Sequence, residues 1–260
     1  MTPINTFFLR VAARCNLCCD YCYVFRHRDM SWKNLPAHMD LATVQIFSDR
    51  LKEYLLETQI KEVNIIYHGG EPLIIGPDRI IEFSDLITRE IGNMAKVNFS
   101  LQTNGTLLTR SFLEQCKGRN IGISLSFDGN KTVHDKHRKY LNGAGSFDDV
   151  FAGAKLLQEY PSIFEGIIGV IDPQYNPDDI LEFFDSNGLH IVDMLLPDST
   201  YQDPPVGRSE TPDLYASWLC NAFDSWFYKH QSISFRTFEH ILKGIMGVES
   251  SLDSFGLGEL

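Results

Sequence analysis

The chain has 260 residues, of which 43% are hydrophobic and 22% are charged, and its formal net charge is −11. This composition excludes an intrinsically disordered chain and fits one large soluble domain, or one domain with an appendage. The acidic charge argues against a nucleic-acid partner. No run approaches the roughly 20 apolar residues that cross a bilayer, and the first residues lack a small-residue cleavage site. We therefore expect a cytoplasmic protein without a membrane partner.

Strand-like and helix-like segments alternate along the first 200 residues. The predicted strands are 4–12, 63–68, 97–102, 121–127, 164–171 and 190–196. The predicted helices are 41–57, 78–91, 109–116, 147–159 and 177–187. Asp40 is the expected N-cap of the first helix, and Pro177 and Gly188 mark the start and end of the last. Such alternation predicts an α/β fold with a parallel sheet and right-handed crossovers, as a partial (β/α)6 TIM-like barrel over residues 1–200.

The segment after the sixth predicted strand has a different character. Residues 197–212 are rich in Pro, Asp, Ser and Thr and read as a loop. Helical patterns return over 214–228 and 238–246, and 250–260 show no periodicity. We therefore assign residues 201–260 to a C-terminal helical extension.

Four of the six cysteines, Cys15, Cys18, Cys19 and Cys22, lie within eight residues directly after the first strand. So tight a cluster in a cytosolic chain indicates metal or iron–sulfur ligation rather than a disulfide framework. Three thiolates can bind three irons of a cubane cluster and leave the fourth iron open to a ligand. A zinc site that uses Cys18 or a distant histidine, and a set of buried cysteines, are the alternatives. Zinc sites commonly have a second ligand pair downstream, and none is apparent here.

The order Cys15-x3-Cys19-x-Tyr21-Cys22 after a first strand resembles the radical S-adenosylmethionine (SAM) enzymes. The resemblance implies that Cys15, Cys19 and Cys22 hold a [4Fe–4S] cluster, with Cys18 as a non-ligand. It also implies that the open iron is chelated by the amino and carboxylate groups of SAM, with Tyr21 near the adenine.

The motif His68-Gly69-Gly70-Glu71-Pro72 follows the second predicted strand. Gly69 and Gly70 permit close backbone approach, and Glu71 can accept a hydrogen bond from an ammonium group. Read alone, the motif is a common turn. In the family that the chain resembles, it binds the methionine amino group of SAM.

Polar residues also stand at the ends of later strands. Asn104-Gly105 alone predicts a simple turn, and residues 134–138 alone predict a solvated charged loop. The resemblance implies cofactor contacts from Thr103 and Asn104, from Ser124 in preference to Ser126, from Arg138 to the cofactor carboxylate, and from Leu195 to the adenine.

The string from Leu195 to Pro205, Leu-Leu-Pro-Asp-x-Thr-x-x-x-Pro-Pro, resembles a narrower group, the peptide maturases that form cyclophane crosslinks. The resemblance implies that SAM yields methionine and a 5′-deoxyadenosyl radical, which abstracts hydrogen from a side-chain carbon. The carbon radical then joins an aromatic ring of a ribosomally made precursor peptide. The expected partners are this peptide and an electron donor such as a flavodoxin or ferredoxin. No catalytic base is assigned.

Three alternatives remain open from the sequence. One is a related enzyme of the anaerobic sulfatase-maturating type, which forms formylglycine. The others are a non-enzymatic iron–sulfur module and a zinc-binding structural protein. Many peptide-modifying relatives carry a following cysteine-rich domain with auxiliary clusters, whereas no cysteine follows Cys220. Either the chain is truncated or this member lacks those clusters.

Overall fold

The computed structural model describes residues 3–26, 28–200, 202, 204–205 and 213–248. The strands are β1 (Thr6–Ala12), β2 (Glu62–Gly69), β3 (Lys96–Thr103), β4 (Ile121–Ser126), β5 (Phe164–Val170), β6 (Ile191–Leu195) and β7 (Ser234–Phe235). The α-helices are α1 (Leu41–Thr58), α2 (Pro77–Ile91), α3 (Arg110–Arg119), α4 (Lys131–His137), α5 (Phe147–Gln158), α6 (Pro177–Ser186), α7 (Leu214–Tyr228) and α8 (Arg236–Ile245). Short 3-10 helices are η1 (Ser31–Asn34) and η2 (Pro72–Ile75).

The strands form a seven-stranded sheet in the order of the chain, and every strand pair whose register is described is parallel. The predicted α/β fold with a parallel sheet is therefore confirmed, and all six predicted strands are present within one or two residues of their expected ends. The structure adds a seventh strand of two residues, β7, and a short helix, α4, where the sequence predicted a charged loop. Both helices predicted beyond residue 213 are present, as α7 and α8.

Several expectations concern residues outside the described ranges. These are most of the loop predicted over 197–212 and the irregular end from residue 250. The assignment of 201–260 to a separate extension stays a prediction. Within the described residues, no helix is both long and apolar enough to traverse a bilayer.

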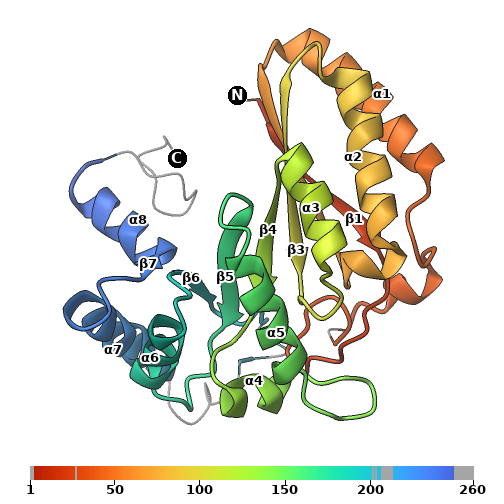
Figure 1. Ribbon diagram of the computed structural model, residues 1–260. Helices are drawn as coiled ribbons and strands as arrows, with labels where there is room; N and C mark the ends of the chain where they lie inside the picture. Colours follow the sequence, from red (N-terminus) through yellow and green to blue (C-terminus); the bar gives the residue numbers. More distant parts are fainter. Residues whose placement is uncertain (1–2, 27, 201, 203, 206–212, 249–260) are drawn as a thin grey trace. The chain divides into compact units, whose positions relative to one another are not determined.

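The chain divides into two compact units, and Figure 1 gives the labels of their elements. The first unit comprises residues 1–126 and 138–165, and the second comprises residues 127–137 and 166–260. Each is described below by itself.

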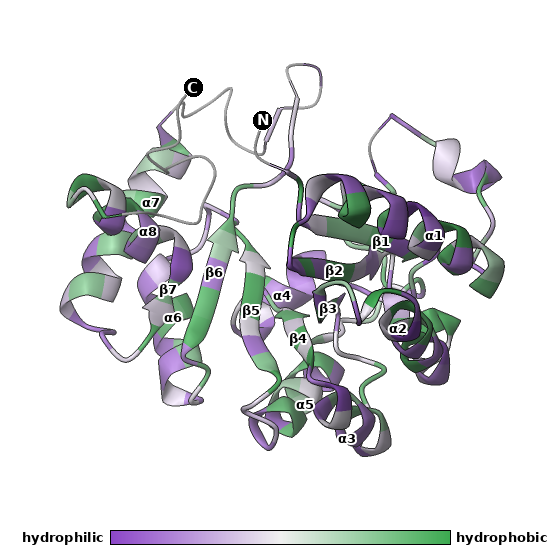
Figure 2. Cartoon of the chain, turned by 90° about the horizontal axis from the view of Figure 1, so that it is seen from above, coloured by the Kyte–Doolittle hydropathy of each residue, from purple (hydrophilic) through white to green (hydrophobic). Residues whose placement is uncertain are grey.

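In the first unit, one face of β1–β4 is apolar and packs against the helices. Tyr67 of β2 is fully buried and hydrogen-bonds to Ser84 of α2 at 2.9 Å. Its register partners Leu9 and Leu101 are buried as well. Figure 2 shows both hydrophobic and hydrophilic residues on α1 and α2, as expected of helices that have one side on a sheet and the other in solvent.

The other face of these strands is polar, because side chains alternate between the two faces of a strand. Asn98 Nδ2 donates to Asn64 Oδ1 at 2.9 Å, and Gln102 Nε2 donates to Ser126 Oγ at 2.8 Å. We call this surface the polar face and define it by Asn64, Asn98, Ser100, Gln102, Ser124 and Ser126, all of which are half-buried. This face differs from the interior of a closed TIM barrel, which branched apolar side chains fill. Its amide and hydroxyl groups are suited to hydrogen-bonding a polar molecule.

Capping residues fix where the helices start. Asp40 accepts a hydrogen bond from the Thr43 backbone N–H at 2.8 Å, which confirms it as the N-cap of α1. Pro177 occupies the first turn of α6, and Gly188 beyond its end has φ of +70°. The sequence signals for these helix ends were therefore sufficient.

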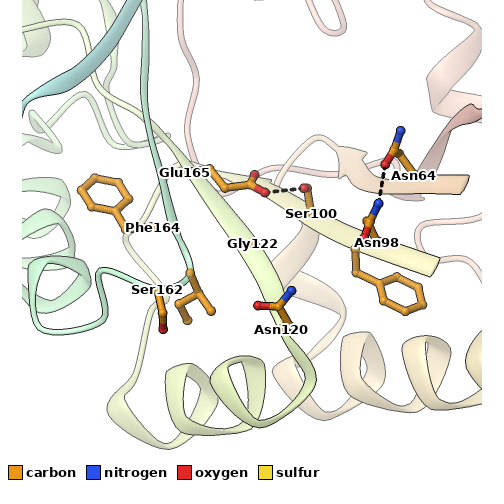
Figure 3. Close-up of a pocket in the computed structure, with 10 residues that line it drawn as sticks. Asn64, Asn98, Ser100, Asn120, Gly122, Ser162, Phe164 and Glu165 are labelled. Atoms are coloured by element: carbon orange, nitrogen blue, oxygen red, sulfur yellow. Dashed lines mark hydrogen bonds between the residues drawn. The ribbon is translucent and has the colours of Figure 1, made fainter. Parts of the chain in front are cut away.

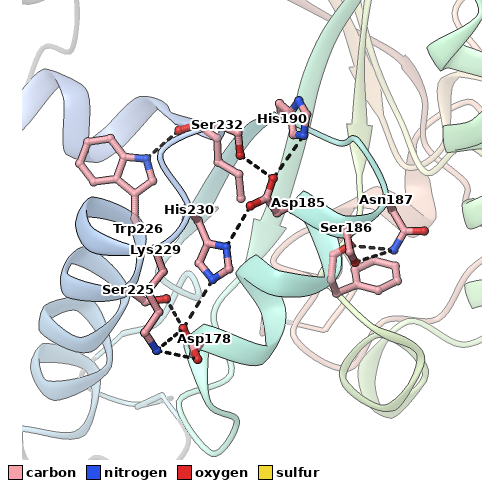
Figure 4. A network of polar contacts seen from close by, with 12 residues as sticks. Asp178, Asp185, Ser186, Asn187, His190, Ser225, Trp226, Lys229, His230 and Ser232 are labelled. Carbon is pink, nitrogen blue, oxygen red and sulfur yellow. Dashed lines mark hydrogen bonds and ion pairs between the residues drawn. The ribbon is translucent and has the colours of Figure 1, made fainter.

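The second unit contains an ionic network around His230, between α6 and α7 (Figure 4). His230, only 4% exposed, lies 3.1 Å from Asp185 Oδ2 through Nδ1 and 3.5 Å from Asp178 Oδ1 through Nε2. Asp178 also accepts hydrogen bonds from Ser225 Oγ at 2.5 Å and from Lys229 Nζ at 3.0 Å. The network joins the carboxyl end of α7 to α6.

This network predicts a loss of stability in acid. Hydrogen bonds from Ser225 and Lys229 hold the pKa of Asp178 below its usual value. A carboxyl group whose pKa is depressed in the folded state stabilises the protein above its unfolded-state pKa, near 3.9, and loses that effect as the pH falls. We expect Asp178→Asn to cost about 1 kcal/mol at pH 7, a value reduced for the partial exposure of the carboxylate, and to cost much less near pH 3.

Thermal unfolding followed by circular dichroism from pH 7 to pH 3 tests this expectation. The matched control is Asp224→Asn, because Asp224 is exposed on α7. A difference between Asp178→Asn and wild type that stays constant over this pH range would contradict the assignment.

Candidate functional site

The cysteine loop leaves the carboxyl end of β1 and turns back on itself. The Cys22 N–H donates to the Cys19 carbonyl at 3.3 Å, and the Arg26 N–H donates to the Cys22 carbonyl at 2.8 Å. Cys15 Sγ accepts from the Leu17 N–H at 3.3 Å. In the described part of the chain the cysteines are thiols and not disulfides, and Cys15, Cys19 and Cys22 are half-buried.

The environment of Cys15 favours the neutral thiol until a metal binds. Burial raises the pKa of Cys15 to about 12, and the charges of Glu71 and Cys19 act in the same direction. Because the thiolate is the metal-binding form, a metal has to displace this proton.

The cysteine loop fits an iron–sulfur cluster by the chemistry of its side chains. Each iron of a cubane cluster takes one thiolate. Three thiols presented on one short loop therefore fit this group.

Cys18 lies in a different environment from the other three. Its N–H donates to the Lys139 carbonyl at 2.6 Å, and its Sγ accepts from Arg26 Nη2. This thiol is thus engaged by a guanidinium. Its role as a non-ligand stays a prediction.

Gly69 and Gly70 lie against the backbone that leads into the cysteine loop. A Cβ at Gly70 would come 2.1 Å from the Arg14 carbonyl oxygen, and one at Gly69 would come 2.4 Å from that of Ala12. Gly69 also has φ of +149°. The Gly70 N–H donates to the Ala12 carbonyl at 2.8 Å, so the first and second loops share backbone hydrogen bonds. Only glycine fits at either position.

Glu71 joins the second loop to the third. Its side chain is fully buried and accepts hydrogen bonds from Thr103 Oγ1 at 2.7 Å, the Asn104 N–H at 2.7 Å and the Leu73 N–H at 3.0 Å. Burial raises the pKa of this carboxyl, and these three donors oppose the effect. The structure thus shows a cross-linking role that the motif did not predict, while contact of Glu71 with an ammonium group stays a prediction.

Asn104 connects the third loop back to the cysteines. Its Nδ2 donates to Asn16 Oδ1 at 2.8 Å and lies 3.9 Å from Cys15 Sγ. Asn16 Nδ2 in turn donates to Thr106 Oγ1 at 2.8 Å. Sequence reasoning missed Asn16 and Thr106. The position of Asn16 directly after the first cysteine was the available signal.

Arg138 brings a positive charge to the same place. It is nearly buried, and its Nη1 donates to Tyr21 Oη at 2.9 Å. Burial is the main influence on the pKa of both Cys15 and Glu71 and raises each, and the Arg138 guanidinium lowers both. A cation beside the thiols fits a ligand that carries a carboxylate.

The structure thus gathers most of the predicted site residues in the first unit. Those linked by the interactions above are Cys15, Cys19, Tyr21, Gly69, Gly70, Glu71, Thr103, Asn104 and Arg138, with Cys22 on the same loop. Ser124 lies on the polar face, where its Oγ donates to Glu165 Oε2 at 3.2 Å. Leu195 belongs to the second unit and is 42% exposed.

The chain is similar to one protein-family model and to several known proteins. A model of the radical SAM superfamily matches residues 9–186. The cysteine-type anaerobic sulfatase-maturating enzyme of Clostridium novyi (strain NT) is 24% identical over 258 residues, which are 95% of this chain and 67% of that protein. The serine-type enzyme of Bacteroides thetaiotaomicron is 27% identical over 248 residues, covering 86% and 57% of the two chains.

A solved structure with a bound ligand and peptide is also similar. Native anSMEcpe with bound AdoMet and Kp18Cys peptide superimposes with a TM-score of 0.81 and 25% identity. The match covers 96% of this chain and 68% of that one.

Proposed function

This chain belongs to the radical SAM superfamily, and on that premise we propose that it is a peptide-modifying enzyme of the anaerobic sulfatase-maturating type. Such an enzyme oxidises a cysteine or serine side chain of a peptide to the aldehyde of formylglycine. The observation that carries the proposal is similarity over 95% of the chain to a sulfatase-maturating enzyme. The fold shared with a peptide-bound structure supports it.

Enzymes of this superfamily use a [4Fe–4S] cluster and SAM, which when bound supply one electron and a carbon-centred radical that removes a hydrogen atom from the substrate. We assign Cys15, Cys19 and Cys22 to the cluster. We assign the SAM contacts to Tyr21, Gly69, Gly70, Glu71, Thr103, Asn104, Ser124, Arg138 and Leu195.

The chain's own residues orient this site. Gly69 and Gly70 let the second loop approach the cysteine loop closely enough for their backbones to hydrogen-bond. Glu71 fixes the Asn104 backbone, and the Asn104 side chain then reaches the first cysteine. Arg138 provides a guanidinium for a carboxylate and holds the Tyr21 hydroxyl.

Cyclophane formation is the second candidate. It depends on the string from Leu195 to Pro205 and stays an untested prediction. The relatives named above favour sulfatase-type maturation over it. The expected partners are a peptide and an electron donor such as a flavodoxin or ferredoxin.

An anaerobic peptide assay separates the two candidates. The reconstituted enzyme is incubated with SAM, reductant and a cysteine-containing, a serine-containing or an aromatic-rich peptide. We expect an aldehyde product that reacts with a hydrazine reagent and shifts in mass accordingly. Aldehyde trapping is essential, because a serine aldehyde and a carbon–carbon crosslink both correspond to the loss of two hydrogen atoms.

The control is the Cys19→Ala variant, which should give no product. A product that does not react with hydrazine and whose fragmentation spectrum shows a crosslink would contradict sulfatase-type maturation and support cyclophane formation.

A further inference from the structure

A polar cavity of about 340 Å³ lies at the amino ends of β2–β5 in the first unit, toward the opposite ends of the strands from the cysteine loop (Figure 3). Its lining includes Asn64, Asn98, Ser100, Asn120, Gly122 and Glu165. Glu165 is the only ionisable residue that lines it. The cavity adjoins the polar face and was not anticipated from any sequence motif.

The Glu165 carboxylate is held in place by residues of two neighbouring strands. Its Oε1 accepts from Ser100 Oγ of β3 at 2.8 Å, and its Oε2 accepts from Ser124 Oγ of β4 at 3.2 Å. Gly122 provides the space, because a Cβ there would come 1.9 Å from Glu165 Oε1. The position of the carboxylate is thus determined by three residues beyond Glu165 itself.

The charge of Glu165 has no cationic partner in the described part of the chain. Its hydrogen-bond donors are the neutral hydroxyls of Ser100 and Ser124. A carboxylate has lone pairs for about four donors, so it retains acceptor capacity toward the cavity. The formal net charge of −11 adds a long-range attraction for a cation.

We propose that Glu165 is a specificity-determining residue that binds a lysine or arginine side chain of the peptide substrate. This inference rests on the proposed function, since it assumes that a peptide lies along the polar face. Ser100, which hydrogen-bonds to the carboxylate, lies three residues before Thr103. Thr103 is at the cysteine-loop end of β3, and three residues of strand span about 10 Å. An extended peptide spans that length in about three residues, so the cation is separated from the modified side chain by a few positions.

The test measures binding without turnover. The reconstituted enzyme with SAM and no reductant is titrated into fluorescein-labelled cysteine peptides, each with one arginine two to five positions from the cysteine. Matched peptides carry citrulline, the neutral isostere, in place of the arginine. Because Glu165 is exposed, we expect wild type to bind the arginine peptide about twofold to fivefold more tightly than its citrulline counterpart for at least one position.

Glu165→Gln should abolish this preference and leave the affinity for the citrulline peptide unchanged. Gly122→Ala should weaken the preference while the charge is retained, because it displaces the carboxylate. Glu57→Gln, an exposed change on α1 with the same effect on net charge, should keep the full preference. The absence of an arginine preference at every position, or its persistence in Glu165→Gln, would overturn the inference.

The result is separable from that of the aldehyde assay. An arginine preference that depends on Glu165 supports this inference even where no aldehyde forms, and that outcome would reject only the proposed chemistry. Aldehyde formation without an arginine preference would reject only the role of Glu165.

Discussion

Alanine at Cys15, Cys19 or Cys22 should leave the anaerobically reconstituted protein nearly free of iron, whereas Cys18→Ala should retain about four iron atoms per chain. The reason is that each ligand thiolate holds one iron, and the loop supplies no substitute. Cys18 is engaged elsewhere, by Arg26 and by the Lys139 carbonyl. Iron and sulfide analysis together with the electron paramagnetic resonance signal of the reduced protein provides the measurement.

Cys116→Ala serves as the control, because this buried cysteine lies on α3 and is not part of the cysteine loop. If Cys18→Ala loses the cluster and one of the other three variants retains it, the ligand register is wrong.

Glu71→Ala should lower the stability of the cofactor-free protein by about 2–4 kcal/mol, since it leaves buried donors without an acceptor. The donors are the backbone N–H groups of Leu73 and Asn104 and the hydroxyl of Thr103. For a chain of this size the loss corresponds to about 5–15 °C in melting temperature. Differential scanning calorimetry under reducing conditions provides the measurement.

Glu71→Gln should give an intermediate loss. The glutamine side-chain oxygen can still accept hydrogen bonds from Leu73 and Thr103. Its NH2 group, however, would stand against the Asn104 N–H, so that two donors meet without an acceptor. Glu57→Ala, on the exposed side of α1, is the matched control and should shift the melting temperature little. A Glu71→Ala variant that melts with wild type would show that the buried carboxylate does not join the two loops.

The strands and most helices were predictable because their periodicity is strong. The segment 63–68 is rich in β-branched and aromatic residues, and it became β2 with one residue added at each end. β7 was missed because a strand of two residues, Ser234 and Phe235, is too short to show alternation. α4 was read as a loop because only two of its residues, Val133 and His134, are buried, and its helical period is therefore weak.

The candidate site was predictable where a motif of the resembled family stands next to a strand end. The three cysteines and the two glycines stand next to strand ends, and the parallel sheet brings those ends together. The partners of Glu71 were not predictable, because Asn104 and Thr103 are more than 30 residues away and hydrogen bonds across loops leave no local pattern. Glu165 was missed for the same reason. Alternation puts Ser124 and Ser126 on one face of β4, but it gives no information about the carboxylate that Ser124 contacts.

The order of β1–β4 in the sheet matches their order in the chain, and this has a consequence for biosynthesis. Each new strand joins an edge that the previously made strand has just provided, so this half of the fold requires no late return of a distant segment. A ribosome releases residues from the amino terminus at about 5–20 per second. The nascent polypeptide can therefore assemble these strands and their crossover helices stepwise while translation continues.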